Sequence, residues 1–204
     1  MLIRDFYIDV VTSQDRRPNS LEAFAATLET KHEEEFLENY TSFEQLESDI
    51  FRQNFVELRD SLLQDEVYQS YNAREKLLAI FFTWFEQITP QRDFWRIVER
   101  EEDFFSCQSY MEQTKEPFEE LMTVVIEEGK QEEIIAQRPF EDWYKKGLWW
   151  DARYLIGFWL KDESENLEKT DAAIEKAINF SFDVMEPNLL DSGFDFIKFA
   201  FQNR

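Results

Sequence analysis

The sequence predicts an all-α fold, and three observations support this prediction. Apolar residues recur at spacings of three and four along most of the 204 residues, which is the helical period. Hairpin dipeptides such as Asn-Gly and Asp-Gly are missing from the chain. Aromatic residues make up 17% of the chain against four Gly and five Pro, the reverse of the bias of disordered segments. The chain therefore has the material for a helical core.

The first sixty residues predict three short helices and then a long one. The first begins at Ile3 and ends before a polar stretch that contains Pro18. Ser20 is the expected N-cap of the second helix. Thr30, followed three residues later by Glu33, matches a capping box that opens the third helix. Ser42 is expected to cap the long fourth helix, which continues to about residue 62.

The remainder predicts further helices separated by prolines and polar turns. Helices are expected over 72–89, 91–100, 117–135, 140–160, 167–182 and 189–202. A further short helical piece is expected through Phe104 and Tyr110. The helix over 140–160 is apolar on several faces, and such a helix is expected to be buried on all sides.

Several residues of the first four helices match a known family pattern. Leu21, Phe24 and Ala25 stand where that family shows a short Ile-Ala signature. A second run resembles its aromatic-x-x-Phe-x-Ser-Lys-x-x-Leu pattern, with one residue inserted, at Phe36, Tyr40, Ser42, Glu44 and Leu46. In these respects the chain resembles the tetracycline repressor (TetR) family. The resemblance implies a helix-turn-helix unit over residues 1–48 and a larger helical ligand-binding and dimerisation domain over 49–204.

The charge of the predicted helix-turn-helix departs from the family pattern. From Ala26 to Phe51 the sequence has eight acidic residues and one basic residue, Lys31, and the whole chain carries a net charge of −22. Phosphate contacts need cations, so this segment is expected to repel DNA. Two interpretations remain open: an operator is still bound through Arg16, Arg17, Lys31 and His32, or the unit survives as packing and its DNA role has decayed.

The excess of aromatic residues suggests a pocket for an apolar small molecule or lipid. Pockets in helical bundles are mostly apolar and aromatic. The alternative is that the same side chains form solid core and dimer contacts. The predicted pocket residues are Phe81, Phe82, Trp84, Phe85, Trp95, Phe105, Tyr110, Trp150, Tyr154 and Phe158.

The last long helices carry more apolar surface than one core can hide, which favours a homodimer. The family resemblance places a two-fold four-helix bundle there. The predicted dimer residues are Trp143, Gly147, Gly157, Ile174, Ile178 and Phe182.

A second resemblance suggests an alternative function. The stretch from Trp143 to Asp171, with Trp159-Leu160-Lys161-Asp162 and Thr170-Asp171, is similar to the C-terminal part of the mitochondrial ubiquinone-biosynthesis accessory protein. That protein has a TetR-like fold and holds an isoprenoid lipid, but it does not bind an operator. A non-regulatory lipid-binding protein is therefore the alternative to a regulator.

Composition argues against the other function classes. One histidine in 204 residues leaves His-dependent catalysis and His-rich metal sites almost nothing to use, and the four glycines form no phosphate loop. We therefore expect no enzyme, no metal and no cofactor. The single cysteine, Cys107, allows no internal disulfide, and no apolar run is long enough to span a membrane. We expect a soluble cytoplasmic protein.

Overall fold

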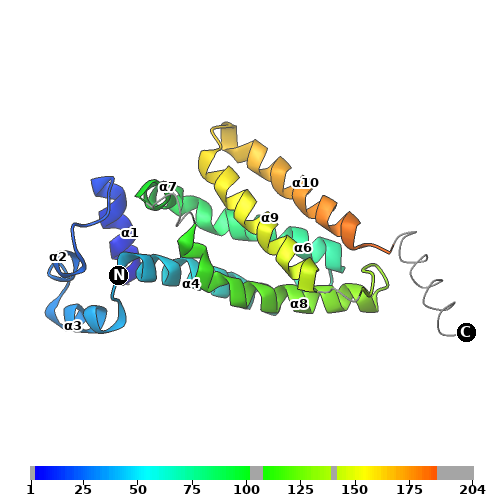
Figure 1. Ribbon diagram of the computed structural model, residues 1–204, viewed down its shortest axis with the longest axis horizontal. Coiled ribbons are helices and arrows are strands. Elements are labelled where there is room, and N and C mark those ends of the chain that lie inside the picture. The colour runs from blue at the N-terminus through cyan, green and yellow to red at the C-terminus, as the bar shows by residue number, and fades with distance from the viewer. Residues whose placement is uncertain (1–2, 102–107, 139–141, 188–204) are drawn as a thin grey trace, which may run out of the picture. The chain divides into compact units, whose positions relative to one another are not determined.

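The structure, a computed structural model, describes residues 3–101, 108–138 and 142–187 (Figure 1). Throughout these ranges the regular secondary structure is helical and contains no strand, which confirms the predicted all-α fold. The predicted helix over 189–202, together with Phe104 and Phe105, lies outside the described residues.

The chain divides into two compact units that interleave along the sequence. Unit 1 holds residues 1–58 and 83–117, and unit 2 holds 59–82 and 118–204. Two long helices belong partly to each unit: α4 (Phe43–Gln64) and α6 (Ala73–Ile88). The predicted boundary between residues 48 and 49 falls inside α4, so the division into 1–48 and 49–204 stays a prediction about function.

Unit 1 begins with the three predicted short helices. They are α1 (Ile3–Gln14), α2 (Leu21–Ala25) and α3 (Thr30–Asn39). As predicted, the Ser20 hydroxyl accepts a hydrogen bond from the Ala23 N–H at 3.1 Å and caps α2. The Ser42 hydroxyl accepts from the Gln45 N–H at 3.1 Å and caps α4. Unit 1 also contains α7 (Arg92–Glu101), which packs against α1, and a 3₁₀ turn over Ser109–Thr114.

The predicted capping box of α3 is wrong. The N-cap of α3 is Glu29, and no side chain caps it. A reciprocal pair of this kind occurs instead before α6, where the Asn72 N–H donates to the Glu75 carboxylate and the Glu75 N–H donates to the Asn72 side chain. Both Thr30 with Glu33 and Asn72 with Glu75 have the sequence spacing of a capping box, so the spacing alone does not decide where one forms.

Aromatic rings fill the core of unit 1. Tyr7 and Phe24, both fully buried, meet edge to face at 5.2 Å between ring centroids, and Phe36 contacts Phe24 at the same distance. Burying one such ring stabilises the fold by about 1.5–3 kcal/mol. These contacts fix the three short helices against one another.

Unit 2 contains one short helix and three long helices among the described residues. They are α5 (Glu66–Gln69), α8 (Lys115–Gln131, in this unit from Phe118), α9 (Asp142–Lys161) and α10 (Glu168–Met185). Helices α9 and α10 pack along one another and are joined by a 3₁₀ turn over Glu165–Leu167 (Figure 1).

Helix α8 ends earlier than predicted. The expected helix reached residue 135, but Glu133 has a left-handed backbone (φ 60°). The Gly129 carbonyl accepts the N–H groups of both Ile134 and Ile135, which closes the helix end. Ile135 then folds back onto Gly129 and is buried.

The prediction that the helix over 140–160 is buried on all sides is also wrong. Leu148, Ala152, Leu155 and Trp159 are buried, but Trp143 and Trp150 on the other face of α9 are 72% and 70% exposed. Helix α9 therefore covers the core of unit 2 with one face and presents aromatic side chains on the other.

Candidate functional site

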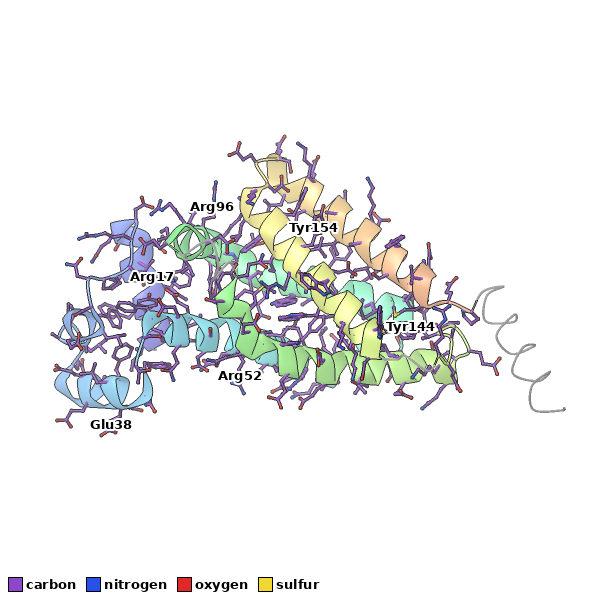
Figure 2. The ribbon with its side chains drawn as sticks, in the orientation of Figure 1. Arg17, Glu38, Arg52, Arg96, Tyr144 and Tyr154 are labelled. Atoms are coloured by element: carbon purple, nitrogen blue, oxygen red, sulfur yellow. The ribbon has the colours of Figure 1, made fainter. Side chains whose placement is uncertain are left out.

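The surface of the predicted helix-turn-helix segment is acidic. On α2 and α3 the side chains of Glu22, Glu34, Glu35 and Glu38 are exposed, and Glu38 lies on the outer side of α3 (Figure 2). His32 is also exposed, with its ring nitrogen 3.8 Å from the Glu35 carboxylate. Carboxylates at this density repel phosphate.

Arg17, one of the predicted DNA contacts, is used inside the protein. Its side chain is 12% exposed and donates two hydrogen bonds to the Glu47 carboxylate, at 2.8 Å from Nε and 2.6 Å from Nη2. The Tyr7 hydroxyl donates to the same carboxylate at 2.8 Å. The Arg17 backbone N–H donates to the Glu101 carboxylate at 3.2 Å, which joins the segment after α1 to the end of α7.

Burial dominates the electrostatics of this cluster. Desolvation raises the pKa of Glu47, while Arg17 and the Tyr7 hydroxyl act in the opposite direction. Burial, followed by the charge of Glu47, raises the pKa of the Tyr7 hydroxyl far above its usual range. The arrangement holds the polypeptide around α1 in place and leaves the Arg17 guanidinium no free donor edge of the kind that a phosphate contact needs.

The other two predicted DNA contacts differ in how much the structure says about them. Arg16 is exposed, next to Arg17 but outside the buried cluster. Lys31 lies in the first turn of α3, and its side chain is outside the described part of the structure. DNA contact through Arg16, Lys31 and His32 stays a prediction.

The predicted pocket residues belong to both units. In unit 1, Trp84, Trp95 and Tyr110 lie together and are fully buried; the Trp95 and Tyr110 rings are 5.0 Å apart, and Phe51 contacts both. Phe85 is buried in the same unit. In unit 2, Phe81 packs against Phe118, Phe82, Trp150 and Tyr154 are exposed, and Phe158 is half-buried on α9. A pocket formed by these residues stays a prediction. Phe105 lies outside the described residues.

Unit 1 contains buried polar atoms without a hydrogen bond. Trp95 Nε1 and Thr114 Oγ1 have no hydrogen-bond partner among the described residues, although both side chains are fully buried. An unsatisfied buried donor costs about 1–3 kcal/mol.

The predicted dimer residues separate into two groups. Ile174, Ile178 and Phe182 are buried within unit 2, and their place in a dimer interface stays a prediction. Their burial follows from the side of α10 that they share, which packs against the rest of the unit. Trp143 and Gly147 are exposed on α9, and Gly157 is half-buried.

Exposed apolar side chains from α9 and α10 form a surface that we call the aromatic face. Tyr154 on α9 is exposed (Figure 2). Phe180 (69% exposed) and Val184 lie on α10. The face consists of Trp143, Gly147, Trp150, Tyr154, Phe180 and Val184. The sequence-based prediction named neither Phe180 nor Val184 and placed Trp150 and Tyr154 in the pocket; both assignments stay predictions. The signal was the alternation of steps of four and three through 143, 147, 150 and 154, the spacing of a helix-helix seam.

The described residues contain neither a membrane-spanning helix nor a cluster of metal-binding side chains. In the described ranges no helix has the length and apolar character needed to cross a membrane. Over the same ranges no group of three or more His, Cys, Asp or Glu side chains is placed to hold a metal ion.

The fold and its surfaces define a class: an all-α protein with three short N-terminal helices followed by long aromatic helices. Within this class, a family model described as "Tetracyclin repressor-like, C-terminal domain" matches residues 76–200, more than half of the chain. The chain belongs to the tetracycline repressor-like family, as the sequence resemblance predicted. The family is one of transcriptional regulators, which are in general not enzymes. Comparisons with curated proteins and with solved structures gave no match.

Proposed function

We propose that this protein is a homodimeric TetR-like regulator that binds an apolar effector and binds DNA weakly or not at all. The observation that carries the proposal is the use of Arg17. A cation that could contact DNA is engaged by Glu47 inside unit 1, while the outer surfaces of α2 and α3 present carboxylates. In this proposal residues 1–48 form the former DNA-reading region, and 49–204 form the effector-binding and dimerisation region.

The loss of DNA binding follows from charge. Lys31 is the one basic residue between Ala26 and Phe51, and phosphate contacts are what position a recognition helix before it reads bases. Restoring cations on the same helix should restore affinity. Glu34→Lys with Glu38→Lys changes two exposed α3 side chains without touching the Arg17–Glu47 cluster.

A gel-shift experiment at low salt tests this part of the proposal. The wild-type protein should give no saturable shift with DNA from its own upstream region, while the double variant should gain salt-sensitive, sequence-independent affinity. Alanine in place of both glutamates is the control, because it removes negative charge without adding cations. Saturable and sequence-specific binding by the wild-type protein would contradict the proposal.

The aromatic face supports the homodimer. Contiguous exposed apolar patches on a helix pair commonly mark a protein interface. Three aromatic residues of α9 and one of α10 are more than 60% exposed: Trp143, Trp150, Tyr154 and Phe180. In a two-fold assembly each copy offers the same surface, so the face would bury itself against its own counterpart.

Sedimentation equilibrium of the full chain tests the homodimer. Trp150→Glu should place an unpaired charge in the interface and convert the dimer to a monomer. Val124→Glu is the matched control, since Val124 is 48% exposed on α8 in the same unit but outside the aromatic face. A monomeric wild-type protein at high concentration would contradict the homodimer, as would a Trp150→Glu variant that dimerises normally.

The unpaired atoms in unit 1 support an apolar effector. Trp95 Nε1 is a donor and Thr114 Oγ1 can donate or accept, so a small apolar molecule with an oxygen acceptor would satisfy groups that the described residues leave unpaired. Native mass spectrometry of the purified protein should show a bound small molecule, and Trp95→Phe should weaken its retention. Absence of any bound molecule, with no binding of an apolar dye, would contradict this part.

Two results together would favour the alternative function of a lipid-binding accessory protein. The first is an isoprenoid or other lipid in the mass spectrum, and the second is unchanged expression of neighbouring genes when the gene for this protein is deleted. The acidic α2–α3 surface is compatible with this alternative as well, because a carrier has no need of DNA.

A further inference from the structure

A carboxylate and a hydroxyl join the two helices of the aromatic face. The Ser181 hydroxyl of α10 donates a short hydrogen bond to the Asp151 carboxylate of α9, and both side chains are half-buried. Neither residue belongs to the core contacts of unit 2 or to the predicted sites described above.

The sequence positions place this pair at the edge of the aromatic face. Asp151 follows Trp150 and lies one turn before Tyr154, while Ser181 follows Phe180 and lies one turn before Val184. With 3.6 residues per turn, each polar residue stands about 100° around its helix from its exposed aromatic neighbour. Because the two residues are hydrogen-bonded to each other, the exposed sides of α9 and α10 lie on the same side of the helix pair.

Asp151 has no ion pair among the described residues. One turn away on either side, neither helix carries an acidic or a basic side chain. These positions are Gly147, Leu148, Tyr154 and Leu155 on α9, and Ala177, Ile178, Val184 and Met185 on α10. Burial raises the pKa of Asp151, and the hydrogen bond from Ser181 opposes this effect in part. The carboxylate is thus partly desolvated before any partner arrives.

We propose that Asp151 makes self-association of this protein acid-dependent, because a second copy seated on the aromatic face covers this carboxylate and dimer formation takes up a proton there. The inference rests on the homodimer proposed above. Covering the pair removes the remaining water from Asp151, and no side chain one turn away supplies a compensating cation. The neutral acid keeps its contact with Ser181 and avoids the desolvation cost of the ion.

The sign of the effect follows from linkage. Because the dimer holds the proton more tightly than the monomer, its dissociation constant is lowest at acid pH. It increases with pH as the carboxyl ionises in the monomer, and it levels off when Asp151 is ionised in both states. Each unit by which dimerisation raises the pKa corresponds to about a tenfold change in the dissociation constant per carboxyl.

Sedimentation equilibrium of the full-length protein at constant ionic strength, from about pH 5 to about pH 8, tests the inference. The dimer dissociation constant of the wild-type protein should increase by about tenfold or more over this range. The Asp151→Asn protein should dimerise tightly, and its dissociation constant should depend much less on pH. The control is Asp171→Asn, which removes the same charge from an exposed position at the start of α10 and should keep the wild-type slope.

A second variant tests the direction through the hydroxyl. Ser181→Ala removes a hydrogen bond that favours the ionised carboxylate, so it should move the pH dependence toward higher pH. Equal slopes for wild-type, Asp151→Asn and Asp171→Asn proteins would overturn the inference and leave the homodimer standing. A wild-type protein that is monomeric at every pH would instead overturn the proposed homodimer.

Discussion

Arg17 and Glu47 form a two-point ion pair that links the segment after α1 to helix α4, with Nε–Oε1 at 2.8 Å and Nη2–Oε2 at 2.6 Å. The Glu47 side chain is 1% exposed, so this carboxylate depends on Arg17 and on the Tyr7 hydroxyl for its interactions. The pair explains how the predicted helix-turn-helix segment keeps its fold although its surface charges repel DNA.

Removing one partner of this pair should destabilise the fold strongly. Arg17→Ala leaves the Glu47 carboxylate buried without its cation, for which we expect a loss of about 3–5 kcal/mol in the free energy of unfolding measured with urea. Arg16→Ala removes the same charge from an exposed neighbour and should change stability by less than about 0.5 kcal/mol. If both variants were equally stable, the ion pair would have no structural role.

The ion pair also shows why sequence alone did not assign Arg17. Arg16 and Arg17 are adjacent and chemically identical, and the acceptor lies thirty positions later in a run with seven other acidic residues. Which of the eight is buried depends on how α1 packs on α4. Local signals predicted the Ser20 and Ser42 caps and the order of three short helices before a long one. They failed at the start of α3 and at the end of α8.

The aromatic residues of the second half show the same limit. Their number predicted a large apolar surface. The composition of a Trp-rich helix, however, does not show which of its faces packs against the core. The buried set of α9 includes Leu148, Leu155 and Trp159, and the exposed set includes Trp143 and Trp150. Only the contacts of the neighbouring helices decide between core, pocket and interface.

Asp162 should make stability depend on acid. Burial alone would raise the pKa of this carboxyl, but hydrogen bonds from the side chains and backbone N–H groups of Ser164 and Thr170 outweigh it and hold the pKa well below its usual range. A depressed pKa stabilises the fold above the unfolded value of about 4, and this contribution is lost as the pH falls below it.

Asp162→Asn tests this expectation, because asparagine keeps the shape of the side chain but not its charge. Urea unfolding at about pH 7 should show a loss of about 1–3 kcal/mol, and the difference from the wild-type protein should shrink at about pH 3. Asp171→Asn serves as the exposed control. A difference that stays constant with pH would show that the charge of Asp162 does not stabilise the start of α10.

Gly129 should tolerate no side chain. A Cβ added there would lie 2.6 Å from Ile135 Cδ1 and 2.9 Å from the Ala73 Cβ, where α8 ends against the start of α6. The Ile135 side chain could turn away, but the Ala73 Cβ is fixed to the backbone of α6. We expect Gly129→Ala to lower the free energy of unfolding by about 1–3 kcal/mol. Unchanged stability would mean that the two helix ends separate easily.

Gly147 should behave in the opposite way, because a Cβ there meets nothing within 4 Å. Glycine within an exposed helix costs about 0.5–1 kcal/mol relative to alanine, and no contact with the described part of the chain explains it on α9. On the aromatic face, however, a missing side chain beside Trp143 and Trp150 leaves space for the backbone of a second copy. We therefore expect Gly147→Ala to raise the stability of the monomer by about 0.5–1 kcal/mol in urea unfolding. Gly147→Leu should leave the helical circular dichroism intact while raising the dimer dissociation constant in sedimentation equilibrium, since its side chain would occupy that space. A Gly147→Leu protein that dimerises as tightly as the wild type would place the partner elsewhere on the molecule.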